Sequence, residues 1–271
     1  MAVLDRENGK IYYTVQGPAD GAVLLMLRGL GRSSRYWLSF DKIMARDFRV
    51  ITFDARGLGR STQPMEWTDS LETLADDCLA ILDHLQIKKF HMFGLSFGGM
   101  IAATIAAEAP NRILSLAIAA SSSADGHRFR LNPRVLPKLL NALRKGRFQD
   151  ALLETVVPDL ILRSWRPEIQ TSWVEILKIE GFPLSTTLKQ LRLCLTYKIK
   201  GRLDKGLYPI LFLHGSMDRF VPVANSIEMQ KLVPRAKIRI VKGAGHEIAL
   251  GYEHELSKVL RVFAETPNKL V

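Results

Sequence analysis

The sequence predicts an α/β protein with a mostly parallel central sheet flanked by helices, and three observations carry this prediction. Strand-like and helix-like stretches alternate over residues 1–120, as they do in α/β folds. The inner strand candidates, such as Val23–Leu27, are continuously apolar, which indicates a parallel sheet covered on both faces. Between Ser121 and Lys205 the strand signals stop, and they resume at Pro209. One sheet interrupted by one helical insertion is therefore expected.

Each element of this pattern has a local signal. Apolar side chains three and four residues apart predict an amphipathic helix over Ser70–Leu85, and nearly uniform apolarity predicts a buried central helix over Phe97–Ala109. Two further helices are expected at Ala224–Leu232 and Glu253–Phe263. The strand candidates are Lys10–Val15, Ala22–Leu27, Arg49–Phe53, Lys89–Phe93, Ile113–Ala119, Pro209–His214 and Lys237–Val241.

Residues 121–205 are predicted to form a helical cap, inserted into a core domain made of residues 1–120 and 206–271. We expect the cap to supply specificity, through apolar side chains that either contact the substrate or form the core of the cap. These side chains are Trp165, Trp173, Phe182 and Leu184. The helix-like patterns of the cap are punctuated by Pro133, Pro137, Pro158, Pro167 and Pro183.

The distribution of charge argues against a nucleic-acid partner. Residues 121–205 hold sixteen Lys and Arg against eight Asp and Glu, so this segment carries +8 of the formal charge of +11. No signature of a nucleic-acid-binding fold accompanies this excess. Two interpretations stay open: an ordinary solvated surface, or a field that attracts an anionic substrate, carrier or membrane surface.

The sequence also predicts a cytoplasmic protein. Charged residues follow Met1 where a secretory leader needs an apolar core, and no apolar stretch approaches the roughly 20 residues that span a bilayer. We therefore expect neither a leader nor a membrane span. Cys78 and Cys194 lie in apolar, helix-like patterns and are expected to be reduced.

A candidate nucleophile stands at Ser96. The segment Gly94–Gly99 has the pattern Gly-x-Ser-x-Gly between a predicted strand and a predicted helix, which is the context of a nucleophile elbow. The strained turn holds the hydroxyl at the edge of the sheet, and the flanking glycines leave room for close backbone approach.

A serine hydroxyl needs a base to take its proton, and His246 is the candidate. It lies in a glycine-containing loop after the strand Lys237–Val241 and follows both Ser96 and the candidate acid in the chain. The other histidines that we weighed have ordinary structural interpretations, and they are His84, His91, His127 and His254.

The candidate acid is Asp218, just past the end of an apolar strand, where functional loops of a parallel sheet converge. The chain order Ser96, Asp218, His246 is the order expected for this arrangement. Asp125 is the rival carboxylate, and Asp54 is expected instead to hold the Arg56–Gly57 loop.

Two backbone N–H groups are expected to stabilise an oxyanion. Phe97 follows the serine at the start of a helix, and Leu30 lies in the loop after the strand that ends at Leu27. Donors aimed at the developing charge can each contribute roughly 3 kcal/mol in the transition state.

Taken together, these motifs resemble those of the α/β-hydrolase fold superfamily over nearly the whole chain outside the cap. Asp54–Ser61 resembles the loop after the fourth strand of this superfamily, and Gly94–Gly99 resembles the elbow of its serine esterase and enol-lactonase branches. The resemblance implies a cap inserted after the sixth strand. Haloalkane dehalogenases have aspartate where this chain has Ser96, which argues against halide chemistry.

One position departs from the family, which usually has histidine where this chain has Arg28 before the glycine of the oxyanion loop. Arg28 either binds a substrate carboxylate through both of its terminal nitrogens or pairs with a nearby acid of the protein. Both roles stay open, because sequence does not give the direction of the side chain.

The reaction expected from these residues is hydrolysis of a carboxylic ester or lactone through an acyl-enzyme, with no metal or organic cofactor. Hydrolysis of a diketone carbon-carbon bond or of a thioester is the alternative within the fold. A family member that binds a ligand without turnover is a third interpretation. The partner is a small molecule, an anionic one being among the options, and the oligomeric state is left open.

Overall fold

Among residues 2–125 and 131–267, which the computed structural model describes, eight strands form one sheet in the order β1-β2-β4-β3-β5-β6-β7-β8. β1 and β2 are antiparallel to their neighbours, and β4, β3, β5, β6, β7 and β8 run parallel. The predicted mostly parallel sheet is thus confirmed. The strands are β1 Ala2–Arg6, β2 Gly9–Gln16, β3 Val23–Leu27, β4 Arg49–Phe53, β5 Phe90–Leu95, β6 Ile113–Ala119, β7 Ile210–Gly215 and β8 Lys237–Val241.

The one strand that the sequence analysis missed is β1, at the antiparallel edge. Its five residues alternate between half-buried and exposed, and Val3 is 47% exposed. A short edge strand with one covered face lacks the continuous apolar run that marks the inner strands.

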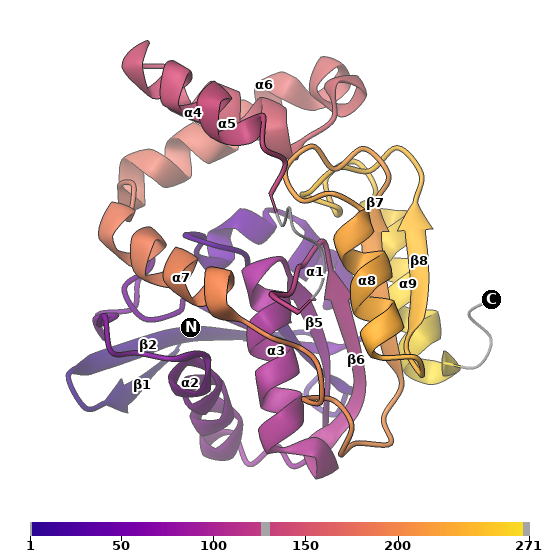
Figure 1. Ribbon diagram of the computed structural model, residues 1–271. Helices are drawn as coiled ribbons and strands as arrows, with labels where there is room; N and C mark the ends of the chain where they lie inside the picture. The colour runs from indigo at the N-terminus through magenta and orange to yellow at the C-terminus, as the bar shows by residue number, and fades with distance from the viewer. Residues whose placement is uncertain (1, 126–130, 268–271) are drawn as a thin grey trace.

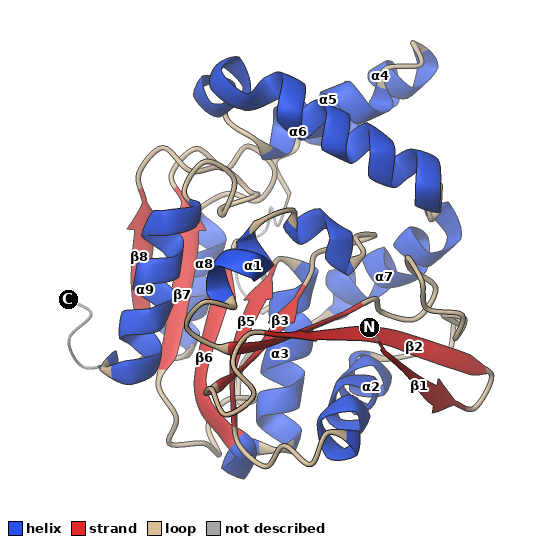
Figure 2. Cartoon of the chain, turned by 180° about the vertical axis from the view of Figure 1, so that it is seen from behind, coloured by secondary structure: helices blue, strands red, loops and turns tan. Residues whose placement is uncertain are grey.

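Helices cover both faces of the sheet (Figures 1 and 2). Side chains alternate along β3, so that Leu25 and Leu27 join the core on one face and Leu24 and Met26 join the core on the other. The first face is covered by α2, α3 and α8, and the second by α1 and α9. These helices are α1 Phe40–Met44, α2 Leu71–His84, α3 Phe97–Glu108, α8 Ala224–Leu232 and α9 Glu253–Glu265.

The two long helices of the first face follow the sequence signals. Ser70 caps α2, since its hydroxyl accepts from the Thr73 N–H and the Thr73 hydroxyl accepts from the Ser70 N–H. Ten of the twelve residues of α3 are buried, because α3 lies against β5 and β6 on one side and α2 on the other. The predicted central buried helix is therefore present.

In the part of the chain that the structure describes, four helices lie between β6 and β7, and the first three lie above the carboxyl ends of the strands (Figure 1). Pro158 and Pro183 immediately precede α6 and α7, as helix-start residues, but Pro167 lies inside α6 and does not divide it. These helices are α4 Val135–Arg144, α5 Phe148–Val156, α6 Asp159–Glu180 and α7 Leu184–Thr196. The side chains of Leu136, Leu143, Gln149, Trp165 and Arg166 in them are not described.

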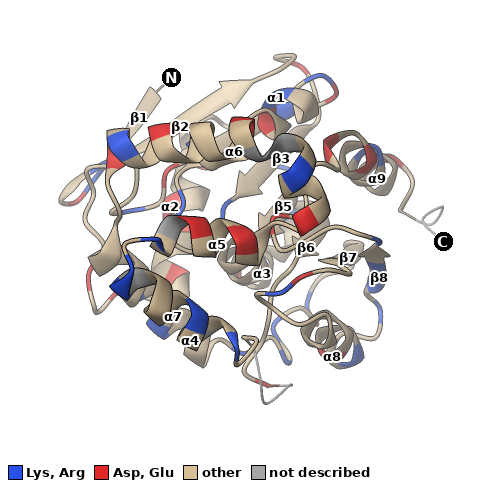
Figure 3. Ribbon diagram, turned by 90° about the horizontal axis from the view of Figure 1, so that it is seen from above, with Lys and Arg blue, Asp and Glu red and all other residues tan. Residues whose placement is uncertain are grey.

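Lys and Arg are the charged residues of α4 and α7, Asp and Glu are those of α5, and α6 carries both signs (Figure 3). Some of these charges pair within the insertion, as Lys138 does with Glu154 at 3.5 Å. No helix in the described part of the chain is both long enough and apolar enough to cross a membrane.

Candidate active site

Ser96 stands in the turn between β5 and α3, with a backbone φ of +56° that non-glycine residues rarely adopt. Its N–H donates to the Ala119 carbonyl at 2.8 Å, and the Ser121 hydroxyl donates to the Ser96 carbonyl at 2.9 Å. Bonds to the end of β6 and to the residues after it therefore hold the strained turn in place.

Two glycines allow the backbone to pack tightly around this turn. A Cβ atom on Gly94 would overlap the Gly98 carbonyl, and a Cβ atom on Gly98 would overlap the Leu27 carbonyl. Neither glycine has a positive φ, so the requirement is space rather than backbone freedom.

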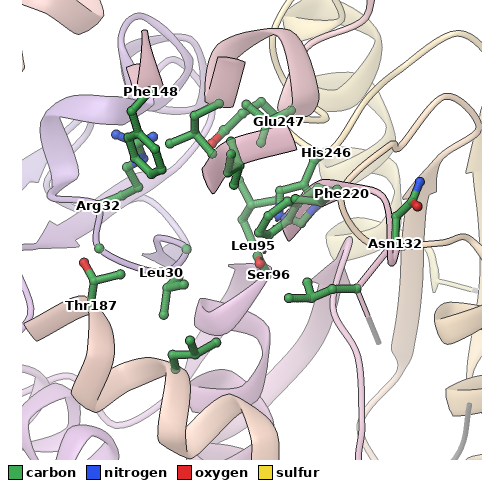
Figure 4. A pocket seen from close by; sticks show the side chains of 18 of the residues that line it. Leu30, Arg32, Leu95, Ser96, Asn132, Phe148, Thr187, Phe220, His246 and Glu247 are labelled. Carbon is green, nitrogen blue, oxygen red and sulfur yellow. Dashed lines mark hydrogen bonds between the residues drawn. The ribbon is translucent and has the colours of Figure 1, made fainter. Parts of the chain in front are cut away.

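The structure brings Ser96, His246 and Asp218 into one chain of hydrogen bonds. The Ser96 hydroxyl lies 3.0 Å from His246 Nε2, and His246 Nδ1 lies 2.9 Å from Asp218 Oδ2 (Figure 4 shows Ser96 and His246). Asp218 follows β7 and His246 follows β8, so the carboxyl ends of three parallel strands deliver the three side chains. In the neutral ring with its proton on Nδ1, Nε2 is free to accept the proton of the serine.

Asp218 is held as an ionised acceptor. Its Oδ1 accepts from the N–H groups of Phe220 and Val221, each at 2.8 Å, and its Oδ2 lies 3.1 Å from Nε2 of the fully buried His214. Burial alone would raise the pKa of Asp218. Attraction to His246 and hydrogen bonds from His214 and His246 outweigh that effect, so the pKa lies well below its ordinary range.

The same contact sets the basicity of the imidazole. Burial acts to lower the pKa of His246, but the attraction and the hydrogen bond of Asp218 outweigh burial, and the pKa lies above its ordinary value of 6.5. The carboxylate thus stabilises the imidazolium that forms when the ring takes a proton.

Two backbone donors lie beside Ser96. Within the described residues, neither the Leu30 N–H nor the Phe97 N–H donates a hydrogen bond. The adjacent Gly31 N–H, in contrast, donates to Oε1 of Gln190 in α7 at 2.8 Å. Leu30 and Phe97, the two predicted oxyanion donors, are therefore available to a ligand, and Phe97 has the added field of the α3 N-terminus.

Arg28 forms an ion pair with Glu247. Its two terminal nitrogens donate to the two carboxylate oxygens at 2.9 and 3.1 Å, and both side chains are buried. The guanidinium also lies 4.6 Å from the centre of the Trp37 ring. This geometry favours the second of the two roles expected for Arg28, because the nitrogens that a substrate carboxylate would need already bind Glu247.

The rival carboxylates have other partners. Asp125 accepts from the N–H groups of Ile199 and Lys200, beyond α7. Asp54 accepts from Ser34 and from the N–H and Nε of Arg60. Asp54 thus holds the loop that contains Arg56 and Gly57, as expected, and does so through Arg60.

Of the alternative histidines considered as the base, His127 falls outside the described residues and the other three lie elsewhere in the fold. His91 bonds Ser115 within the sheet, His84 lies on α2 and His254 lies on α9.

A cavity of about 580 Å³ opens between Ser96, His246 and the insertion (Figure 4). Phe182 lines it, as expected for a substrate contact, but Leu184 does not and is 57% exposed. Trp173 does not line it either; its ring lies 5.5 Å from that of Tyr36 inside a buried cluster. The side chain of Trp165 lies outside what the structure describes. Most of the lining is apolar, and the insertion contributes Val135, Leu139, Leu140, Phe148, Leu152 and Leu191.

Three polar residues near the candidate site escaped the sequence analysis: Glu247, Gln190 and His214. Glu247 could have been found, because a cation at position 28 needs a buried counter-charge and Glu247 directly follows His246 at the same sheet edge. Gln190 lies 159 residues from Gly31 in the chain, and no local sequence pattern predicts a hydrogen bond between residues so far apart.

Comparisons with known proteins agree on the fold. The family model described as alpha/beta hydrolase fold matches residues 22–251. The chain is 27% identical over 246 residues to a putative carbamate hydrolase RutD of Agrobacterium fabrum, covering 88% of this chain and 92% of that protein. It is 26% identical over 252 residues, or 91% of its length, to the dihydrolipoyllysine-residue acetyltransferase component of the acetoin cleaving system of Pseudomonas putida, but spans only 64% of that protein.

A solved structure gives the same picture. Est816, described as an N-acyl homoserine lactone degrading enzyme, superimposes with a TM-score of 0.78 at 26% identity. The match covers 97% of this chain and all (100%) of Est816.

Proposed function

Because the chain belongs to the α/β-hydrolase fold family, we propose that it is a serine hydrolase that cleaves a carboxylic ester or lactone through Ser96, His246 and Asp218. The family, and with it the expected enzyme class, is confirmed by the match over residues 22–251. The observation that carries the finer proposal is the pair of hydrogen bonds, 3.0 and 2.9 Å long, that links the three side chains.

In the proposed first half-reaction, His246 Nε2 takes the hydroxyl proton as Ser96 Oγ attacks the carbonyl carbon. The carbonyl oxygen becomes an oxyanion that accepts from the Leu30 and Phe97 N–H groups. When the tetrahedral intermediate collapses, the bond to the leaving oxygen breaks and His246 returns its proton to that oxygen. The products are an alcohol and an acyl-serine.

In the second half-reaction, water hydrolyses the acyl-serine by the same steps. His246 takes a proton from water, the resulting hydroxide adds to the acyl carbon, and the bond to Ser96 Oγ breaks as His246 reprotonates it. Asp218 stays ionised throughout and stabilises the charged imidazole. These steps need no cofactor, since the protein supplies the nucleophile, the base and the oxyanion donors.

We propose further that residues 121–205 act as a cap that selects the substrate. The apolar lining from α4, α5 and α7 suits an acyl or aryl group of several carbon atoms better than an acetate. An N-acyl lactone, the substrate class named for Est816, combines an apolar chain with a scissile acyl-oxygen bond. A carbamate, named for the RutD relative, is the second candidate.

The test is a panel of esters, lactones, carbamates, thioesters and diketones, assayed with the native protein and with Ser96→Ala. We expect the best ester or lactone to lose about 10⁴- to 10⁶-fold in kcat with Ser96→Ala. A substrate that both proteins hydrolyse equally well does not use this site, and a panel without any Ser96-dependent hydrolysis would refute the proposal.

A further inference from the structure

A second arginine, Arg32, lines the cavity that contains Ser96. In Figure 4 its side chain lies across the cavity from Ser96 and His246, on the side where Phe148 is drawn. Arg32 belongs to the same loop as Arg28 and Leu30, which runs from β3 toward the 3-10 helix Ser34–Trp37. A cation is thus placed in a cavity whose other lining is mostly apolar.

Arg32 has no counter-ion among the residues that the structure describes. Among the described residues, no Asp or Glu lies within ion-pair distance of its guanidinium. Glu247 attracts Arg32, but both oxygens of Glu247 accept hydrogen bonds from Arg28. Two guanidinium groups therefore share one carboxylate, and a net charge of one unit is left at the cavity wall.

This charge is partly removed from water and fixed in position. Burial lowers the pKa of Arg32, although a guanidinium stays protonated at any ordinary pH. Its central carbon lies 4.3 Å from the centre of the Tyr36 ring and 4.3 Å from that of Trp173. The two rings are buried and nearly perpendicular, at 85°, so they form a corner that orients the guanidinium.

We propose that Arg32 binds a carboxylate carried by the substrate at a distance from the bond that is cleaved. The planar fork of an arginine fits a carboxylate through two parallel hydrogen bonds. One net positive charge matches a monoanion, whereas a phosphate dianion would leave a negative charge uncompensated in an apolar cavity. Carboxylate binding, one of the two roles left open for Arg28, is thus assigned to Arg32. This inference rests on the proposed function for the scissile bond, and the substrates are amphiphilic esters or lactones with an apolar middle and an anionic end.

The experiment uses paired substrates. Aryl monoesters of linear dicarboxylic acids with four to ten carbons are compared with analogues whose far carboxylate is capped as a methyl ester. A second series places the free or capped carboxylate on the alcohol part. We expect the native protein to prefer the free carboxylate by about 10- to 100-fold in kcat/KM at the best chain length of one series.

The variants separate recognition from folding. Arg32→Met should abolish the preference, because kcat/KM should fall about 10- to 100-fold more for the free carboxylate than for the capped ester, and Arg32→Lys should keep part of the preference. The matched control is Arg35→Met, since Arg35 pairs with Glu180 at 3.0 Å and does not line the cavity. Arg35→Met should keep the full preference.

Binding in the Ser96→Ala background tests the inference apart from turnover. Calorimetric titration with the same compounds should show tighter binding of the free carboxylate, and Arg32→Met should remove the difference. If nothing in the panel is hydrolysed but this difference is present, the proposed reaction fails and the anion site stands. The anion site is refuted, and the proposed reaction stands, if hydrolysis depends on Ser96 but neither series favours the free carboxylate. The anion site is also refuted if Arg32→Met weakens binding of both members of a pair equally.

Discussion

The carboxyl edge of the sheet and the helical insertion face the same cavity, yet different kinds of contact build them. At the sheet edge, directed hydrogen bonds link the three candidate catalytic side chains, and the Asp218 carboxylate contacts two N–H groups and two imidazoles. The insertion presents apolar side chains to the cavity and also leaves apolar side chains exposed, such as Leu140 at 53% and Leu188 at 46%.

This difference separates two tasks. Hydrogen bonds fix atoms in distance and angle, which proton transfer requires, whereas apolar contacts fix little more than volume. We therefore expect changes at the sheet edge to alter the rate for every substrate, and changes in the insertion to alter the choice among substrates. Three predictions probe this division, in decreasing order of expected effect.

The largest effect is expected for Asp218→Asn, with a loss of about 10⁴-fold in kcat for all substrates. For the native protein, kcat/KM should rise with pH as His246 loses its proton, with a midpoint above 6.5. Without the carboxylate, burial still lowers the pKa of His246, so the midpoint should move to lower pH. Initial rates between pH 5 and 9 measure both effects.

The matched control is Asp125→Asn, which changes the rival carboxylate in the same way. Because Asp125 bonds backbone groups beyond α7, its replacement should leave the pH midpoint unchanged. If the pH midpoint moved in Asp125→Asn but not in Asp218→Asn, Asp125 rather than Asp218 would be the acid that acts on His246.

The ion pair behind the oxyanion loop should affect stability next most strongly. Glu247→Leu leaves Arg28 buried without its carboxylate, and we expect the free energy of unfolding to fall by about 3–5 kcal/mol. The double variant Arg28→Met and Glu247→Leu removes both charges of the pair. It should therefore recover most of the free energy of unfolding that the single variant loses. Urea denaturation of the single and double variants measures the coupling; losses that merely add would show that the two charges are independent.

The smallest effect is expected in the insertion. Phe148→Ala removes an aromatic side chain from the cavity wall, where it packs 5.6 Å from the Phe182 ring. Losing about 50 Å² of apolar contact costs about 1 kcal/mol, so kcat/KM for a long acyl ester should fall about 5-fold while that for an acetate ester stays unchanged. Ile179→Ala on α6, 65% exposed and away from the cavity, is the control. Equal losses on both esters would break the proposed division of tasks.

The sequence predicts the sheet edge better than the insertion, for a physical reason. Apolar runs, the glycine spacing around Ser96 and the placement of Asp218 and His246 after strands are local signals, and the structure brings these residues together. The helices of the insertion were foreseen only as a group, and Pro167 did not divide α6.

Contacts between distant segments were out of reach. Arg28 and Glu247 are 219 residues apart, and the orientation of Arg28 follows from that pair. Trp173 was a candidate substrate contact, but its ring packs on Tyr36 and Arg32 instead. An aromatic side chain in a helix gives the same sequence signal whether it faces a cavity or the interior.

Among the hydrogen bonds that join these two regions, one runs from the Gly31 N–H to Gln190 over 2.8 Å. A segment grafted from a relative in place of residues 121–205 would have to bring an acceptor to this spot, or the loop next to Leu30 would keep a buried amide without a partner. Exchange of α4–α7 between members of the family therefore requires that the new segment preserve this contact. Substrate range in this chain can be expected to diverge by single replacements along the cavity wall more readily than by wholesale replacement of the segment.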